Sequence, residues 1–202
     1  TVPENVREIA PTTFTAVPRV WEKFYSSVTI AVSESDAVQQ WMYRWALGIG
    51  YKVSDKVTQG QTVPLWLKAC FYIGRWLALD NVRRMIGIHR AKVLVTGAAP
   101  ISPDLVRWYL ALGVPMIEAW GMTESCGAAT VMPADKIKAG LIGPAAPFNE
   151  VRLDPVTQEL LVRGPNVFMG YLNLPDKTAE TIDAEGWLHT GDVGTVDEDG
   201  FF

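Results

Sequence analysis

The stretch from Glu118 to Ser125, EAWGMTES, combines side chains that could together hold a nucleotide. Trp120 has a flat aromatic face, which can stack on a nucleobase. The Thr123 hydroxyl can bind a phosphate oxygen, and the Glu124 carboxylate can carry Mg²⁺ beside substrate phosphates. Gly121 permits close approach of the backbone. The stretch therefore predicts a nucleotide site; the alternative is a strand-to-loop turn with a core tryptophan and a solvated glutamate.

Three further segments accompany this stretch. VLVTGAAP at 93–100 is an apolar run that predicts a buried strand ending in a small-residue turn. The other two are LLVRGPNVFMGYLN at 160–173 and GWLHTGDVG at 186–194. In this order and spacing, the four segments resemble the adenylate-forming superfamily of acyl-CoA synthetases, luciferases and peptide-synthetase adenylation domains. The resemblance covers nearly the whole chain and rests on the ordered set, and it implies ATP and Mg²⁺ as ligands.

The resemblance also implies a role for single residues. Glu124 would bind Mg²⁺ and Thr123 a phosphate oxygen, so these two would act at the reacting centre. Trp120 stands where relatives mostly carry Tyr and would stack on adenine, while Glu118 would accept a hydrogen bond from the exocyclic amine of the base. Asp192 would accept hydrogen bonds from both ribose hydroxyls, since each carboxylate oxygen can take one donor.

Small residues should complete the nucleotide site. Gly97, Ala98 and Ala99 follow a predicted strand, and α/β sheets usually place ligands at such strand ends. They are expected to form the second wall of the adenine site, and a plain strand-to-helix loop is the alternative. Gly121 is assigned to the same site because it gives the backbone room. His189 is expected to be structural.

The segment AVPRVWEK at 16–23 is similar to the corresponding stretch of long-chain fatty acyl-CoA synthetases, in which a tryptophan gates the acyl tunnel. This likeness makes Trp21 the gate; a tryptophan packed in the core is the competing interpretation. The implied activity is a long-chain fatty acid–CoA ligase, which forms an acyl-adenylate from fatty acid and ATP and transfers the acyl group to coenzyme A. The alternatives are a fatty acyl-AMP, very-long-chain or aryl acid ligase, or a non-catalytic acyl or nucleotide binder.

Composition is that of an ordinary globular protein, with 202 residues, a net charge of −4 and 49% hydrophobic residues. No basic stripe accompanies the aromatic residues, which argues against nucleic acid as a partner. Cys70 and Cys126 match no metal or redox spacing, so we expect free thiols in a reducing compartment such as the cytoplasm. His89 and His189 are too few for a histidine-rich metal site.

The order of apolar segments predicts an α/β fold, with a parallel sheet flanked by helices and then a β-rich, barrel-like subdomain. The character changes near residue 135, so the expected parts are 1–135, with the acyl-tunnel and adenine-binding elements, and 136–202, with the ribose-binding motif. Ser102 should cap a helix that begins at Pro103. The expected helices are 1–10, 18–25, 36–56, 64–85, 102–112 and 176–182, and the expected strands are 12–17, 91–96, 114–119, 151–154, 158–163 and those around 188 and 193.

The segment from Pro64 to Met85 is rich in aromatic residues: Trp66, Phe71, Tyr72 and Trp76. Its uncharged stretch is too short to span a bilayer. A core helical hairpin is one interpretation, and a surface that touches a membrane or a fatty substrate is the other. The second would allow peripheral membrane contact.

The chain begins with Thr1 and ends at Phe202, directly after a predicted turn. We interpret it as an excerpt of a longer protein. The family's phosphate-binding loop is expected before Thr1, and its hinge and C-terminal domain after Phe202. The excerpt alone is therefore expected to be inactive.

Overall fold

The computed structural model describes all 202 residues, which divide into two compact units. The first unit comprises Thr1–Ile117 and Ala134–Gly140, and the second comprises Glu118–Pro133 and Leu141–Phe202. The strand β3, Met116–Met122, begins in the first unit and continues into the second. The predicted division into functional parts 1–135 and 136–202 stays a prediction.

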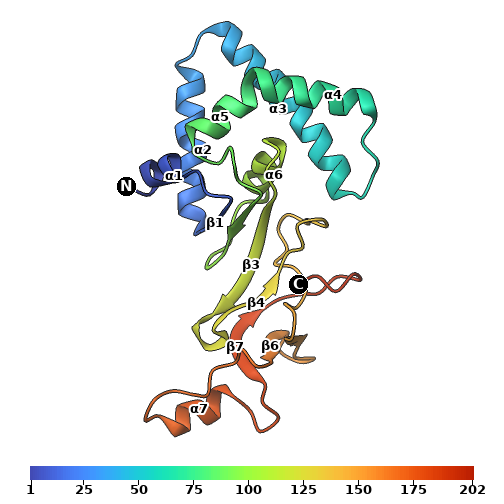
Figure 1. Ribbon diagram of the computed structural model, residues 1–202. Coiled ribbons are helices and arrows are strands. Elements are labelled where there is room, and N and C mark those ends of the chain that lie inside the picture. Colours follow the sequence, from blue (N-terminus) through green and yellow to red (C-terminus); the bar gives the residue numbers. More distant parts are fainter. The chain divides into compact units, whose positions relative to one another are not determined.

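The first unit is mainly helical (Figure 1). Proline occupies the first turn of α1, α2 and α6, where its missing N–H costs no hydrogen bond. The carboxylate of Asp36 caps α3 by accepting the Gln39 N–H at 2.8 Å. Ser102 stands at the N-cap of α6 as predicted, but its side chain makes no capping hydrogen bond. The helices are α1 Val2–Ile9, α2 Pro18–Ser33, α3 Ala37–Thr58, α4 Leu65–Gly74, α5 Asp80–Met85 and α6 Pro103–Ala111.

Two parallel strands underlie these helices: β1, Thr13–Ala16, and β2, Val93–Thr96. They pair in the register Thr13 to Val93 through Ala16 to Thr96. The strand order continues as β1-β2-β3-β4. The predicted α/β fold with a sheet and packed helices is therefore confirmed.

The core of the first unit is aromatic. Trp21 and Phe24 of α2 and Trp108 and Tyr109 of α6 are all buried. The Tyr109 hydroxyl donates to the Trp21 carbonyl oxygen at 2.9 Å. Burial raises the pKa of Tyr109 well above its ordinary value, so its hydroxyl stays a neutral donor.

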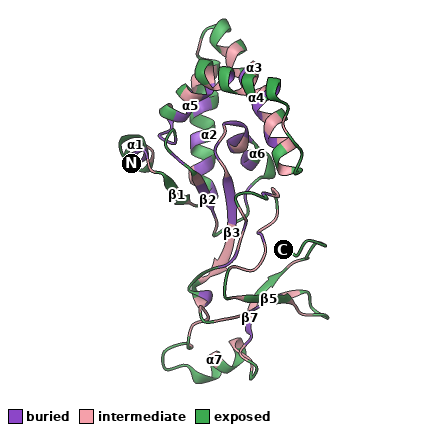
Figure 2. Cartoon of the chain, turned by 45° about the vertical axis from the view of Figure 1, so that its right-hand side comes forward, coloured by how far each residue is buried: buried purple, intermediate pink, exposed green.

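The aromatic segment 64–85 forms one helical run, in which a π-helical turn, Arg75–Leu79, joins α4 to α5. The run packs on α3, so helices are present in both segments where they were expected, 36–56 and 64–85. The core interpretation, however, is wrong for Trp66, Tyr72 and Trp76, which are 64%, 66% and 77% exposed. Figure 2 shows exposed and intermediate positions along α4. One face of the run packs on α3 while these side chains lie on another. None of the helices is long and apolar enough to cross a membrane.

The second unit consists of strands and one short helix, α7, Pro175–Thr181. β3 pairs antiparallel with β4, Gly127–Val131, with an irregularity between Trp120 and Gly121. A separate antiparallel sheet has the order β5-β6-β7, in which the strands expected at 151–154 and 158–163 pair as a hairpin. Its strands are β5 Glu150–Leu153, β6 Glu159–Arg163 and β7 Leu188–Val193.

The expected barrel-like subdomain is not observed, because closure needs more tilted strands than the three in this open sheet. The core of the second unit is built on Ala129, Val162 and Leu188. Trp120 and Phe168, which both belong to the site described next, pack against these three side chains.

Candidate nucleotide site

A short 3₁₀ turn, Thr123–Ser125, carries the predicted acidic residue at the end of β3. The buried Ser125 hydroxyl accepts the Met122 N–H at 3.0 Å and donates to the Gly127 carbonyl oxygen at 2.7 Å. The turn is therefore closed by its own serine. Thr123 is exposed and its hydroxyl has no protein partner, so it is available to a ligand oxygen.

The segment after β6 holds this turn from a distance in sequence. The Phe168 N–H donates to the Glu124 carbonyl oxygen at 2.8 Å. The Tyr171 hydroxyl donates to Oε1 of Glu124 at 2.7 Å, and the Asn166 Nδ2 donates to the Ser125 carbonyl oxygen at 2.9 Å. The hydrogen bond to Glu124 raises the pKa of Tyr171 above its ordinary value, because it favours the neutral phenol.

Trp120 and Asp192, two residues assigned from sequence to the nucleotide, lie side by side. The indole Nε1 donates to Oδ2 of Asp192 at 2.9 Å. Trp120 is half-buried against the core, whereas Asp192 is exposed. Oδ1 of Asp192 has no protein partner, so the carboxylate keeps acceptor capacity for a ligand.

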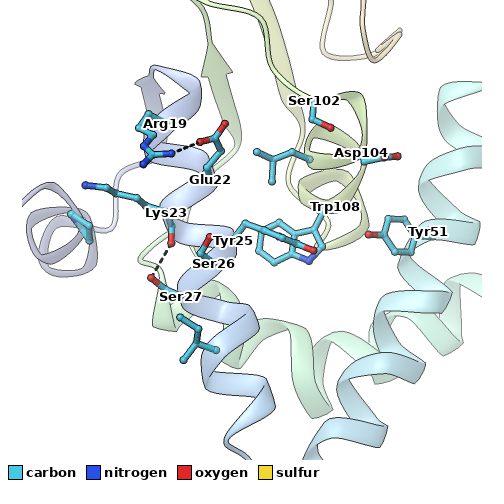
Figure 3. Close-up of a pocket in the computed structure, with 13 residues that line it drawn as sticks. Arg19, Glu22, Lys23, Tyr25, Ser26, Ser27, Tyr51, Ser102, Asp104 and Trp108 are labelled. Atoms are coloured by element: carbon cyan, nitrogen blue, oxygen red, sulfur yellow. Dashed lines mark hydrogen bonds and ion pairs between the residues drawn. The ribbon is translucent and has the colours of Figure 1, made fainter.

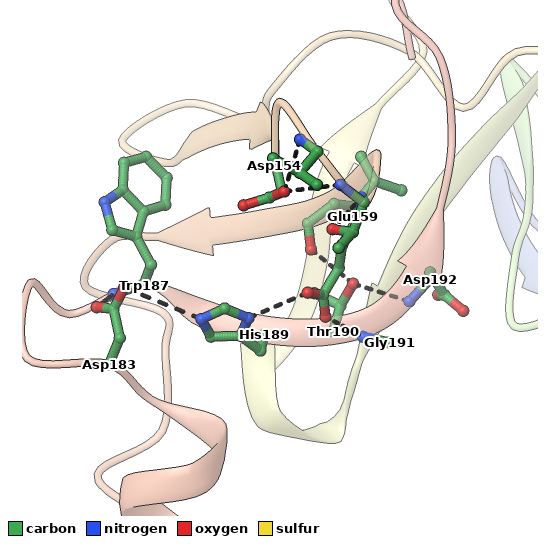
Figure 4. A network of polar contacts seen from close by, with 11 residues as sticks. Asp154, Glu159, Asp183, Trp187, His189, Thr190, Gly191 and Asp192 are labelled. Atoms are coloured by element: carbon green, nitrogen blue, oxygen red, sulfur yellow. Dashed lines mark hydrogen bonds and ion pairs between the residues drawn. The ribbon is translucent and has the colours of Figure 1, made fainter.

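The backbone around Asp192 is fixed by Glu159 of β6 (Figure 4). Its Oε1 accepts the Gly191 N–H at 2.8 Å, and its Oε2 lies 3.0 Å from Nδ1 of His189. The Thr190 hydroxyl donates to the Leu160 carbonyl oxygen at 2.7 Å. His189 thus contacts Glu159 in this network, and its structural role stays a prediction.

Neither Glu159 nor Tyr171 was predicted from the sequence as a site residue. Tyr171 belongs to the quoted segment 160–173, but nothing local in that segment pairs it with Glu124. Glu159 would have been found from the pairing of β6 with β7, which places Glu159 opposite Val193 and Leu161 opposite His189. The contacts of both residues depend on tertiary structure and leave no pattern in the local sequence.

Gly121 has a steric reason to be glycine. A Cβ built there would lie 1.9 Å from the carbonyl oxygen of Gly127 and 2.8 Å from Cα of Ala128. The close backbone approach expected at this residue is therefore made by the neighbouring strand β4, and a contact with nucleotide stays a prediction. Glu118 is only 9% exposed and lies on the same face of β3 as Trp120, two residues away.

The remaining assigned residues belong to the first unit. Gly97, Ala98 and Ala99 follow β2 directly, and Ala98 has a left-handed backbone with φ of 67°. The left-handed region is uncommon for a residue other than glycine, and such residues are often found at functional turns. The adenine-wall role of this loop stays a prediction.

Trp21, the expected gate, is completely buried. Its Nε1 donates to the Ala16 carbonyl oxygen at 3.0 Å, and its ring packs edge-on against Phe14 and Tyr109 at centroid distances of 5.3 and 5.5 Å. This is the packing expected of a core tryptophan. Gating stays a prediction that a substitution can test.

The first unit also contains a cavity of about 710 Å³ beside α2 and α6 (Figure 3). Tyr25 and Trp108 meet edge-to-face in its wall at 5.1 Å, and Arg19 is paired with Glu22 at 3.2 Å. None of the residues assigned to the nucleotide lines this cavity. Its size therefore does not identify it as the nucleotide site.

The residues present fit a magnesium ion that is held mainly by phosphate and water. No group of three or more His, Cys, Asp or Glu side chains gathers in the structure. Mg²⁺ commonly uses one or two carboxylates beside substrate phosphates and keeps several waters. Glu124 meets that need, because Tyr171 engages Oε1 while Oε2 has no protein partner.

Comparison of the sequence with known proteins identifies its family. The model of the family described as AMP-binding enzyme covers residues 1–172. The chain belongs to the AMP-binding enzyme family. Similar members include the long-chain-fatty-acid–CoA ligase ACSBG2 of Xenopus laevis, 37% identical over 98% of this chain and 27% of that protein. The putative fatty-acid–CoA ligase fadD11 of Mycobacterium tuberculosis is 35% identical over 100% of this chain and 35% of that protein.

Two solved structures share the fold over part of this chain. ATP-bound MatB from Rhodopseudomonas palustris matches with a TM-score of 0.52 and 33% identity, over 57% of this chain and 25% of that one. A malonyl-CoA ligase with methylmalonyl-CoA and AMP bound matches with a TM-score of 0.53 and 34% identity, over 65% of this chain and 30% of that one. The chain spans about a quarter to a third of the curated relatives named above, 27% and 35%.

Proposed function

We propose that the protein containing this chain is a long-chain fatty acid–CoA ligase. It would join a fatty acid to the α-phosphate of ATP, release pyrophosphate, and pass the acyl group from the acyl-adenylate to coenzyme A. The substrates named for the relatives support the acyl and CoA halves of this proposal, since the similar curated proteins are named as fatty-acid–CoA ligases.

The observation that carries the nucleotide part is the hydrogen bond between Trp120 and Asp192. An aromatic face and a carboxylate with a free oxygen side by side suit a nucleoside, because the base can stack while the ribose hydroxyls donate to the carboxylate. Trp120 would thus bind adenine and Asp192 the ribose.

The turn Thr123–Ser125 would serve the phosphates. The exposed Thr123 hydroxyl would donate to a phosphate oxygen and orient the α-phosphate, and Glu124 would hold Mg²⁺ through Oε2. The metal would supply positive charge against the phosphates as the pyrophosphate leaves. Because phosphate chemistry of this kind depends on positioning and charge, a turn fixed at several points is well suited to it.

ATP–pyrophosphate exchange by the full-length protein tests the proposal, with acids from butyrate to palmitate as substrates. Each buried CH₂ group contributes about 0.8 kcal/mol, or about fourfold in kcat/KM, so exchange should rise steeply with chain length until the acyl site is full. A flat response would favour another adenylate-forming ligase. AMP binding without exchange for any acid would favour a non-catalytic binder.

A further inference from the structure

The Thr123–Ser125 turn is held by one segment, Asn166–Tyr171, at three places. Asn166 binds the Ser125 carbonyl, Phe168 the Glu124 carbonyl and Tyr171 the Glu124 carboxylate. Two of these contacts fix the backbone of the turn. Only the third, from Tyr171, acts on the side chain that would bind metal.

The contact of Asn166 has a defined orientation. Its Nδ2 faces the Ser125 carbonyl, so its Oδ1 must point the other way, where it is buried without a partner. A side chain at Gly164 would meet this oxygen at 3.0 Å and Oδ1 of Asn149 at 2.8 Å. A larger residue at 164 would therefore have to displace the Asn166 side chain that binds the Ser125 carbonyl.

Tyr171 is well placed to orient a carboxylate. The phenol is 36% exposed, and its ring packs edge-to-face on Phe168 at 4.8 Å, so the hydroxyl approaches Glu124 from a braced position. Hydrogen bonds to a charged acceptor are short and strong, and this one measures 2.7 Å. It engages Oε1 alone.

We propose that Tyr171 is a positioning residue that holds the Glu124 carboxylate in one rotamer and presents Oε2 to Mg²⁺. The inference rests on the proposed role of Glu124 in metal binding. A free glutamate side chain must lose rotamer freedom when it binds metal, whereas a glutamate already held by Tyr171 has lost it before the metal arrives. Tyr171 should therefore affect how tightly Mg²⁺ binds more than how fast the bound complex reacts.

Tyr171→Phe in the full-length protein tests this, because it removes only the hydroxyl. The Mg²⁺ concentration that gives half-maximal ATP–pyrophosphate exchange should rise about threefold to tenfold, the range expected for one hydrogen bond. The rate at saturating Mg²⁺ should change less than about twofold, since saturating metal compensates for the weaker site. Tyr72→Phe is the matched control, because Tyr72 is exposed and its hydroxyl has no hydrogen-bond partner.

Phenol absorbance gives a readout independent of turnover. The difference between the pH titrations of the parent and Tyr171→Phe proteins isolates the titration of Tyr171 from that of the other tyrosines. The pKa of Tyr171 should fall toward its ordinary value in Glu124→Ala, and also in the parent protein when Mg²⁺ and ATP are added, because the metal offsets the carboxylate charge. A Tyr171 titration that Glu124→Ala leaves unchanged would overturn the contact itself.

Glu124→Ala separates this inference from the function on which it rests. Loss of the carboxylate should slow exchange about a hundredfold or more at limiting Mg²⁺, and Tyr171→Phe should then add nothing. Suppose that Glu124→Ala changes how exchange depends on Mg²⁺ concentration, while Tyr171→Phe leaves the half-maximal Mg²⁺ concentration unchanged. Glu124 then keeps its role, and the positioning role of Tyr171 is overturned. If Glu124→Ala has no effect on metal dependence, the proposed metal role fails and the inference fails with it.

Discussion

The Trp120 indole donates a hydrogen bond to Oδ2 of Asp192 at 2.9 Å, although 72 residues separate them in sequence. Sequence analysis gave both carboxylate oxygens to the ribose. In the structure one oxygen already has a donor, although a carboxylate oxygen can accept a second hydrogen bond. Trp120 would therefore stack on the base and also orient the Asp192 carboxylate toward the ribose hydroxyls.

Asp192→Asn in the full-length protein should weaken AMP binding about tenfold to a hundredfold, because it removes a charged acceptor of hydrogen bonds. Trp120→Phe keeps an aromatic face but removes the indole N–H, and should weaken binding by about tenfold at most. Calorimetric titration with AMP measures both. Equal affinity in Asp192→Asn and the parent protein would remove Asp192 from the nucleotide site.

Trp21→Ala should lower the free energy of unfolding by about 3–5 kcal/mol, because it empties a fully buried position. Trp41→Ala is the control: Trp41 is 62% exposed, and its loss should change stability by about 0.5 kcal/mol or less. Denaturant unfolding measures both. A gating role requires in addition that Trp21→Ala change kcat/KM for palmitate much more than for butyrate, whereas equal changes would indicate core packing alone.

Gly121→Ala should destabilise the protein by about 1–3 kcal/mol, because the new methyl group would force β3 away from Gly127. Gly48→Ala offers a contrast. Gly48 lies within α3 with open space around it, so alanine there should stabilise the helix by about 0.5–1 kcal/mol. The melting temperatures of the two variants should therefore shift in opposite directions. An unchanged melting temperature for Gly121→Ala would show that β4 can move to make room for the methyl group.

The turn before Trp187 should respond to acid. Oδ1 of Asp183 accepts the Trp187 N–H at 2.8 Å and the Glu185 N–H at 2.9 Å, and the Trp187 hydrogen bond is the main cause of the lowered pKa of Asp183. A lowered folded-state pKa stabilises the fold above the ordinary carboxyl value of 3.8, and this contribution is lost as the pH falls through the folded value.

Asp183→Asn should therefore be less stable than the parent protein near neutral pH, and the difference should shrink on acidification. Urea unfolding at a series of pH values, followed by tryptophan fluorescence, measures it. Asp135→Asn, at an exposed aspartate without a hydrogen-bond partner, should show no such convergence. A stability difference between Asp183→Asn and the parent protein that does not change with pH would mean that Asp183 acts through packing and not through its charge.

Local sequence signals were sufficient for most elements. The apolar run before Gly97 predicted β2, and the strands expected at 151–154 and 158–163 are present as β5 and β6. β4 was missed because Gly127, Ala128 and Ala129 have weak strand propensity, and the strand is held by its pairing with β3.

The site divides in the same way. Trp120 and Glu124 were singled out by residue type and spacing and Asp192 by the family resemblance, and their roles stay predictions. Their partners were not singled out: Tyr171 reaches Glu124 across 47 residues and Glu159 reaches Gly191 across 32. Such pairs depend on strand pairing and loop path, which no local pattern encodes.

The three contacts between Asn166–Tyr171 and the Thr123–Ser125 turn also set an order of assembly. During synthesis the turn leaves the ribosome before the segment that holds it, so Glu124 is unrestrained until β6 has formed and the following loop has docked. Long-range contacts of this kind form late, because chain entropy opposes them. The Glu124 carboxylate should therefore become oriented only after the neighbouring hairpin has formed, even though Ser125 closes the turn itself locally.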